Sequence, residues 1–276
     1  ADAIVDLLGE LLMMEQQIEG EAKLIENNDN LLNGLGRISK IIKELQNLSM
    51  SLQMVTLKST FQKITRIVRN TIDELSKEIN FKSEGEDTEI DRGVAEKLLD
   101  PLVHLVKNSI SHGIEEEEIR KKLGKDNLGN VQLKAYRKRE NVYIEVIDDG
   151  KGIETEKVYQ KAIEKGLVDK NKNYSQEEII NFIFLPGFST MEVVNNVSGR
   201  GVGMDVVKTE ITKLGGKIEI KTQKDIGSTF TLKIPINLAV LNGTIVELHR
   251  GQFIIPTLNV KQIMQVENKN IVFIKD

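Results

Sequence analysis

The chain has 276 residues, of which 39% are hydrophobic and 29% charged, as expected of a soluble globular protein with two or three domains. Its net charge of -4 argues against a nucleic-acid-binding surface, and it has no apolar run long enough for membrane insertion. The absence of cysteine excludes disulfides and thiolate chemistry, so we expect a cytoplasmic protein, and we find no signal peptide pattern.

Residues 1–56 predict an antiparallel helical hairpin. Two apolar runs with helical spacing flank a polar break at 27–30. The seam consists of Ile4, Leu7, Leu11, Met14, Ile18 and Ile25 in the first run and Leu31, Leu35, Ile38, Ile42, Leu45 and Leu52 in the second. Because one hairpin cannot hide so wide a seam, we expect a homodimer that forms a four-helix bundle. The alternative is a hairpin packed on the rest of its own chain.

The next segment predicts two helices separated by an extended piece. Residues 61–75 form an amphipathic pattern, and 80–91 read as a short extended piece with an acidic turn. A second helix is expected over 98–115, with Pro101 in its first turn and Gly113 at its end.

This second helix carries a polar stripe beside its apolar one. His104, Asn108 and His112 follow one another at intervals of four residues, so their side chains should point the same way. The three together suggest the wall of a ligand site, although each alone could be a solvated polar residue. The acidic run Glu115–Glu118 that follows is expected to favour the positive end of a short helix.

The central part of the chain predicts two pairs of strands with helices between them. We expect strands at 131–136, 142–147, 217–222 and 228–234, and helices at 154–165, 176–184 and 202–214. This order indicates an α/β sandwich, a mixed sheet with helices on one face. Short β segments at 243–249, 252–256 and 271–274 begin a small all-β unit that we expect to be incomplete at Asp276.

Three glycine-containing stretches could carry chemistry. Asp148, Gly150 and Gly152 follow a strand, where a carboxylate can accept from an exocyclic amine while glycines let the backbone approach a flat ring. Three alternating glycines begin a helix within 199–204, where backbone N–H groups can surround anionic oxygens. The stretch 227–230 is a turn and strand start that alone carries little information. Asp-Gly is also common in simple turns.

Taken in this order, the motifs resemble the ATP-binding (Bergerat) fold of the GHKL superfamily, which includes histidine kinases, gyrase B, Hsp90 and MutL. Within it, the chain is most similar to the chemotaxis histidine kinases of the CheA family. The similarity rests on HLVKNSISHGIE, DDGKGI, FLPGFST and GRGVGMDVV. It implies an α+β multidomain chain with a dimerisation hairpin at 1–56, a catalytic ATP-binding domain at 57–237 and the start of a CheW-like, SH3-like β-barrel domain at 238–276.

The resemblance also implies roles for individual residues. Asn108 would hold Mg²⁺, and Asp148 would accept from the adenine amine with Gly152 under the ring and Thr229 nearby. His104, His112 and Lys157 would reach the phosphates, and His104 could instead polarise the nucleophile. Further nucleotide contacts and the lid would come from Gly150, Ser189, Thr190, Gly199, Arg200, Gly201, Val202, Gly203 and Met204.

The activity implied is transfer of the γ-phosphoryl group of Mg-ATP to a histidine on a separate phosphotransfer domain. The implied partners are a CheW-type coupling protein, chemoreceptors and response regulators, with a location in cytoplasmic receptor arrays. The sequence departs from the family at 53–57, where Gln-Met-Val-Thr-Leu replaces a proline-containing join that the family usually shows. The alternatives are a clamp-type GHKL ATPase, which a histidine rather than a glutamate at position 104 disfavours, and a non-catalytic receptor-coupling scaffold.

Overall fold

The protein is described by a computed structural model that covers residues 2–22, 29–75, 77–188, 203–236, 243–248, 251–256, 260 and 262–263. By its internal contacts the chain divides into residues 1–236 and 237–276. No described helix combines the length and the apolar character that a bilayer crossing requires.

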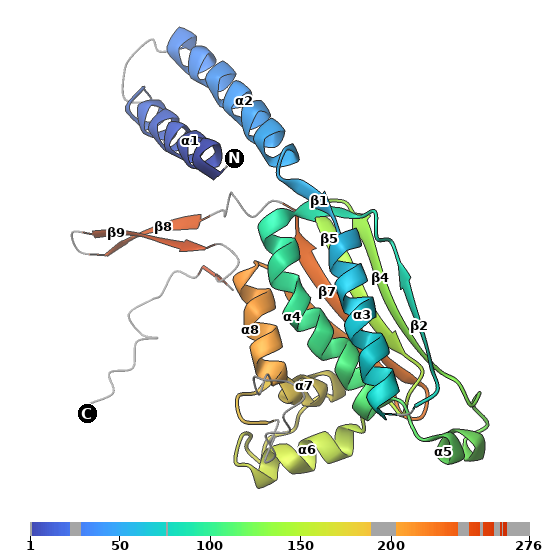
Figure 1. Cartoon of the computed structure of the whole chain (residues 1–276). Coiled ribbons are helices and arrows are strands. Elements are labelled where there is room, and N and C mark those ends of the chain that lie inside the picture. Colours follow the sequence, from blue (N-terminus) through green and yellow to red (C-terminus); the bar gives the residue numbers. More distant parts are fainter. Residues whose placement is uncertain are drawn as a thin grey trace. The chain divides into compact units, whose positions relative to one another are not determined.

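The predicted hairpin is present as helices α1 (Asp2–Ala22) and α2 (Asp29–Ser51), which pack against each other (Figure 1). The residues buried in this contact recur at heptad spacing, with Leu8, Glu15 and Ala22 on α1 and Leu35 and Ile42 on α2. The predicted seam is thus wider than the contact within this hairpin, because only one residue per heptad is buried there. Most described seam residues remain exposed, among them Ile4, Leu7, Leu11, Met14, Ile18, Leu31, Ile38, Leu45 and Leu52. Ile25 lies outside the described residues.

The join after the hairpin is a short strand rather than a free linker. Strand β1 (Met54–Thr56) pairs antiparallel with β3 (Glu89–Asp91). The N–H of Leu57 donates to the Thr88 carbonyl at 3.0 Å, and the Leu57 side chain is fully buried. Residues 54–57 are thus hydrogen-bonded to residues 88–91.

Helix α4 (Arg92–Asn108) begins earlier than the sequence pattern indicates. The Asp91 carboxylate caps it by accepting from the N–H of Val94 at 3.0 Å, as N-cap aspartates commonly do. Pro101 therefore lies inside the helix and not in its first turn, which corrects the prediction. The helix continues as one π-helical turn, η1 (Ser109–Gly113), and ends at Gly113 as expected.

The core is a five-stranded mixed sheet in the order β2-β4-β5-β7-β6. Its strands are β2 (Ile79–Glu84), β4 (Gly129–Lys138), β5 (Asn141–Asp148), β6 (Lys217–Gln223) and β7 (Gly227–Pro235). Strands β2 and β4 run parallel and the other pairs antiparallel. Burial alternates residue by residue along β5 and β7, so one face of the sheet is covered and the other is open.

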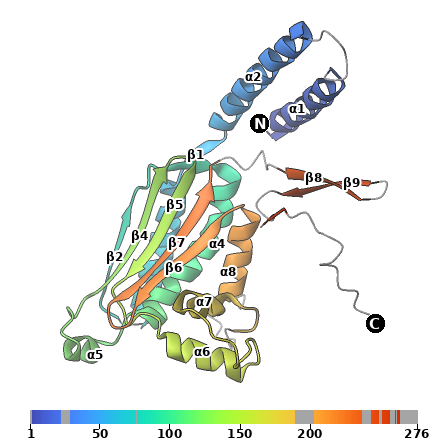
Figure 2. The same ribbon diagram turned by 180° about the vertical axis from the view of Figure 1, so that it is seen from behind.

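Helices α3 (Lys58–Leu75), α4 and α8 (Met204–Lys213) cover that face, as Figures 1 and 2 show from opposite sides. The predicted mixed sheet with helices on one face is confirmed. The smaller helices are α5 (Glu117–Lys122), α6 (Thr155–Glu164), α7 (Gln176–Asn181) and the 3₁₀ turn η2 (Phe182–Phe184). In the second unit, β8 (Gly243–Leu248) and β9 (Gly251–Pro256) form an antiparallel hairpin. The strand predicted at 271–274 lies outside the described residues.

Candidate nucleotide-binding site

A cavity of about 590 Å³ lies at one end of the covered face of the sheet. It is lined by residues of α4 and η1, the loop after β5, helix α6, the beginning of α8 and strand β7. His104, Asn108, His112 and Asp148, predicted from two separate motifs, all line it. Residues predicted from two separate motifs therefore lie around one cavity.

The polar stripe of α4 faces this cavity along its length. The side-chain amide of Asn108 donates from Nδ2 to the sulfur of Met204 at 3.4 Å, which ties α4 to the first residue of α8. This contact uses a donor and leaves the Asn108 oxygen available as a ligand for a hard cation. Asn108 lies at the last residue of the α-helix, just before the π turn.

Both histidines of the stripe are held in their neutral form near pH 7. Burial lowers the pKa of His104 below its usual 6.5, and repulsion between the two rings when both carry a proton adds to this, while the charge of Asp205 opposes it. Burial, followed by the charges of Lys151 and Lys77, lowers the pKa of His112 in the same direction. A neutral imidazole can accept a hydrogen bond or a proton, but it offers little charge to a phosphate.

Asp148 ends strand β5 and is buried, with 6% of its surface exposed. Its Oδ2 accepts from the Ser109 hydroxyl at 2.9 Å, and its Oδ1 accepts from the Gly150 N–H at 3.1 Å. Burial raises the pKa of Asp148, and the hydrogen bonds from Ser109 and Gly150 oppose that rise. Each carboxylate oxygen has two lone pairs and uses one of them in these contacts, so the group can still accept from a donor in the cavity.

The glycines after Asp148 serve the packing of the loop itself. A Cβ on Gly150 would lie 2.2 Å from the carbonyl oxygen of Gly113, and the N–H of Lys151 donates to that same oxygen at 3.0 Å. Gly152 has a φ of 68° and would place a Cβ 2.2 Å from the Gln223 carbonyl oxygen. Both glycines are therefore required by close backbone contacts, and Gly152 also lines the cavity. Gly150 is not among the residues that line it.

The structure corrects the predicted position of Thr229 and adds detail for Lys157. Thr229 does not line the cavity; its strand neighbours Ser228 and Phe230 do, because successive residues of β7 point to opposite faces of the sheet. Lys157 lies at the cavity as expected, but its ammonium group pairs with Glu154 at 2.7 Å and is largely exposed.

The glycine-rich stretch is described only at its end. Gly203 and Met204 line the cavity, and Gly203 is the N-cap of α8. Predicted site residues outside the described part of the chain are Ser189, Thr190, Gly199, Arg200, Gly201 and Val202. At the other side of that stretch, the ammonium group of Lys165 donates to the carbonyls of Gly187 and Phe188 at 3.0 and 2.9 Å.

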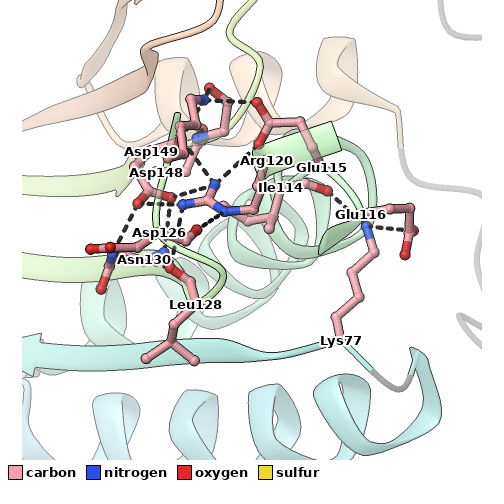
Figure 3. Close-up of polar contacts among 12 residues, drawn as sticks. Lys77, Ile114, Glu115, Glu116, Arg120, Asp126, Leu128, Asn130, Asp148 and Asp149 are labelled. Carbon is pink, nitrogen blue, oxygen red and sulfur yellow. Dashed lines mark hydrogen bonds and ion pairs between the residues drawn. The ribbon is translucent and has the colours of Figure 1, made fainter. Parts of the chain in front are cut away.

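The structure also shows polar residues that the sequence argument missed. Ser109 follows Asn108 directly as the first residue of the π turn, and its hydroxyl donates to Asp148. Glu115 was assigned to the acidic start of a short helix, but it is buried and paired with Arg120 and Lys125 at 3.1 and 2.7 Å. Figure 3 shows this cluster beside Asp148. Nothing in the local sequence indicates that any of these charged residues is buried.

The described residues contain no group of three or more His, Cys, Asp or Glu side chains arranged to hold a metal ion. A metal bound here would rest on Asn108 and on oxygens of its ligand. This donor set suits Mg²⁺, which binds few protein groups together with phosphates and water.

The family comparison agrees with this geometry. The model for the histidine kinase-, DNA gyrase B- and HSP90-like ATPases matches residues 97–238, which include the whole lining of the cavity. The chain belongs to this family of ATPases.

Within this family, the chain is similar to several chemotaxis kinases. The chain is 40% identical over 247 residues to the chemotaxis protein CheA of Listeria innocua, which covers 89% of this chain and 40% of the relative. It is 38% identical over 270 residues to CheA of Rhizobium meliloti, covering 96% and 35%. It is 40% identical over 283 residues to the sensor histidine kinase CheAY of Helicobacter pylori, covering 98% and 35%. The predicted similarity to CheA is confirmed, and the chain spans between a third and two fifths of the length of these relatives.

Proposed function

We propose that the chain is the kinase core of a chemotaxis histidine kinase and transfers the γ-phosphoryl group of ATP to a histidine on a separate phosphotransfer domain. The observation that carries this proposal is the convergence of Asn108 and Asp148 on one cavity in an ATPase-family fold. The names of the relatives, chemotaxis protein CheA and sensor histidine kinase CheAY, support the reaction class.

The purine end of the site is best assigned to Asp148. Its carboxylate is the buried acceptor at the strand end, and Ser109 and Gly150 hold it in place without using all its lone pairs. A buried acceptor rejects a ring that lacks the matching donor, because the acceptor is then left unpaired. Asp148 would therefore select an exocyclic amine, as adenine provides.

The phosphate end would lie along the polar stripe of α4. Asn108 would contribute its amide oxygen to Mg²⁺, which supplies charge neutralisation of the phosphates when bound. His112 and Lys157 line the same cavity. The neutral state of His104 favours a role in accepting a proton from, or polarising, the incoming nucleophile over a role as a cationic phosphate ligand.

The decisive experiment supplies this chain with radiolabelled Mg-ATP and the isolated phosphotransfer domain of a CheA relative. Label should appear on the acceptor domain, and Asn108→Ala should abolish its appearance. Intact ATP binding with no transfer to any such acceptor would refute the kinase assignment. Rapid ATP turnover without an acceptor would favour the clamp-type ATPase, and failure to bind Mg-ATP would favour the scaffold.

We further propose that residues 1–56 form a homodimer. In the single hairpin, Leu7, Leu11 and Met14 on α1 expose 64, 46 and 60% of their surface. Exposed seam residues on α2 include Ile38 and Leu45, at 47 and 46%. A stripe of this size on a soluble protein is normally covered by another protein surface, and a second hairpin of the same sequence has matching heptads.

The remaining assignments follow from the relatives and stay proposals. They are the division into 1–56, 57–237 and 238–276, a CheW-like barrel in the last part, and an association with receptors through a CheW-type coupling protein. Response regulators would take the phosphoryl group downstream, in receptor arrays in the cytoplasm.

A further inference from the structure

A cluster of four charges, with Arg120 and Glu115 buried and Lys125 and Asp149 half-buried, lies beside the proposed purine acceptor (Figure 3). Arg120, on α5, is the largest fully buried side chain among the described residues, with 1% of its surface exposed. Its guanidinium forms a bidentate pair with Asp149, with Nη1–Oδ1 and Nη2–Oδ2 distances of 3.2 and 3.0 Å. It also donates to Glu115 at 3.1 Å and to the Asp126 and Leu128 carbonyls at 2.7 and 3.3 Å.

Lys125 completes the cluster from the loop after α5. Its ammonium group donates to Glu115 at 2.7 Å and to the carbonyls of Asp149 and Gly150 at 2.8 and 2.7 Å. All three of its donors are thus used, and 14% of the side chain is exposed. Two cations face two carboxylates, so the cluster is electrically balanced.

Asp149 is held from the sheet as well. Asn130, at the start of β4, donates to its carboxylate from the backbone N–H and from Nδ2, both at 2.9 Å. Although burial alone would raise the pKa of Asp149, the hydrogen bonds from Asn130 and Arg120 lower it below its usual value. The carboxylate is therefore ionised and fixed.

These contacts converge on two peptide units, the one after Asp149 and the one after Gly150. Arg120 and Lys125 hold the carbonyls of residues 149 and 150, and the N–H of Gly150 in turn donates to Asp148 Oδ1 at 3.1 Å. The two cations therefore restrict the position of Asp148 through the loop that follows it. Buried ion pairs cost much desolvation energy and are a poor way to gain stability alone, so this concentration on one loop needs another reason.

We propose that Lys125 and Arg120 are positioning residues that hold the loop at 148–150 so that Asp148 meets the purine amine at the correct angle. The inference rests on the proposed function, since it takes Asp148 as the purine acceptor. Neither cation lines the cavity, so both act through Asp149 and Gly150 and not on the nucleotide.

The test measures how tightly the whole 276-residue chain binds two nucleotides. They are Mg-ATP and the purine ribonucleoside triphosphate that lacks the 6-amino group. Lys125→Met removes both carbonyl contacts. It should weaken ATP binding roughly tenfold, the size of one charge-assisted hydrogen bond, and change binding of the analogue by less than about twofold. The preference for the amine should therefore largely disappear. A merely structural role would weaken both nucleotides equally.

Two further variants keep the result interpretable. Glu115→Gln combined with Lys125→Met restores the charge balance and should show the same loss of preference if the carbonyl contacts matter. Lys121→Met removes an exposed lysine of α5 that pairs with Glu117 at the surface, and it should behave like the unmodified chain.

The outcomes separate the two proposals. If the unmodified chain prefers ATP and both Lys125 variants retain that preference, the positioning role is wrong while the proposed function stands. An equal loss for both nucleotides also refutes it. If the unmodified chain shows no preference for the amine, the assignment of Asp148 itself fails, and the positioning role falls with it.

Discussion

Replacing Asp148 by asparagine should weaken ATP binding and at the same time stabilise the fold. The side chain keeps its shape, and an amide can accept from Gly150 through its oxygen while donating to the Ser109 hydroxyl. What it loses is the negative charge offered to the purine amine. A hydrogen bond to a charged group contributes about 1.5–3 kcal/mol, so ATP should bind roughly 10- to 150-fold more weakly.

The gain in stability follows from the direction of the pKa shift. Burial raises the pKa of Asp148 above its ordinary 3.8, so the native state holds its proton more tightly than the unfolded state does. The stability of the unmodified chain therefore falls as the pH rises from the ordinary pKa through the raised one. Asparagine has no such charge, so the variant should have the higher Tm at pH 7 and a much smaller advantage below pH 4.

Calorimetric titration with Mg-ATP and thermal unfolding at pH 7 and pH 4 measure both effects. Loss of affinity with a raised Tm would show that the buried charge serves binding at a cost in stability, as functional residues often do. An unchanged affinity together with a lower Tm would refute the reasoning, since it would make Asp148 a structural residue.

Four further predictions concern other parts of the molecule. Asn108→Ala should weaken ATP binding in the presence of Mg²⁺ and leave it nearly unchanged in EDTA; equal losses in both conditions would remove the metal-ligand role. Gly150→Ala should cost about 1–3 kcal/mol of unfolding free energy, because its Cβ meets a backbone carbonyl at 2.2 Å, whereas Gly9→Ala, with open space around it, should cost nothing in urea unfolding. Asp149→Asn should lower the Tm at pH 7, and the gap should close as the pH falls below 3.8, because the pKa of this carboxyl is depressed in the fold. Leu11→Glu should shift the chain from dimer to monomer in light scattering; an unmodified chain that is already monomeric would contradict the dimer proposal.

Local sequence patterns were sufficient to predict most helices and strands and the polar stripe of the site. Strands β5 and β7 were predicted from their period-2 alternation, and helix α3 from its 3.6-residue period. Each of these patterns can be recognised within a single segment of the sequence. The same holds for the stripe of His104, Asn108 and His112, since four-residue spacing on one helix fixes a common direction. The start of α4 was not predicted correctly, because its cap, Asp91, lies several residues before the apolar pattern that begins at Leu98.

Features that depend on tertiary contacts were not predictable in this way. The sequence around Arg120 reads EEIRKK, a polar surface helix, and nothing local marks its third charge as buried. The parallel pairing of β2 with β4 likewise depends on a long crossover that strand periodicity does not encode. Thr229 was misassigned because the register of β7 against the cavity, which decides whether odd or even residues face it, came only with the fold.

Two adjacent aspartates have different roles because they point to opposite sides of the strand end. Asp148 is available to a ligand, and Asp149 anchors the loop. Successive residues point to opposite sides, so Asp148 faces the cavity and Asp149 faces Arg120 and Asn130. Burial with few cationic partners raises the pKa of Asp148, whereas a bidentate arginine and two amide donors lower the pKa of Asp149. One carboxylate is thus destabilised and reserved for a ligand, and its neighbour is stabilised and anchors the loop. Because the two are joined by a single peptide unit, the rigidity of Asp149 limits how far Asp148 can move when a nucleotide binds.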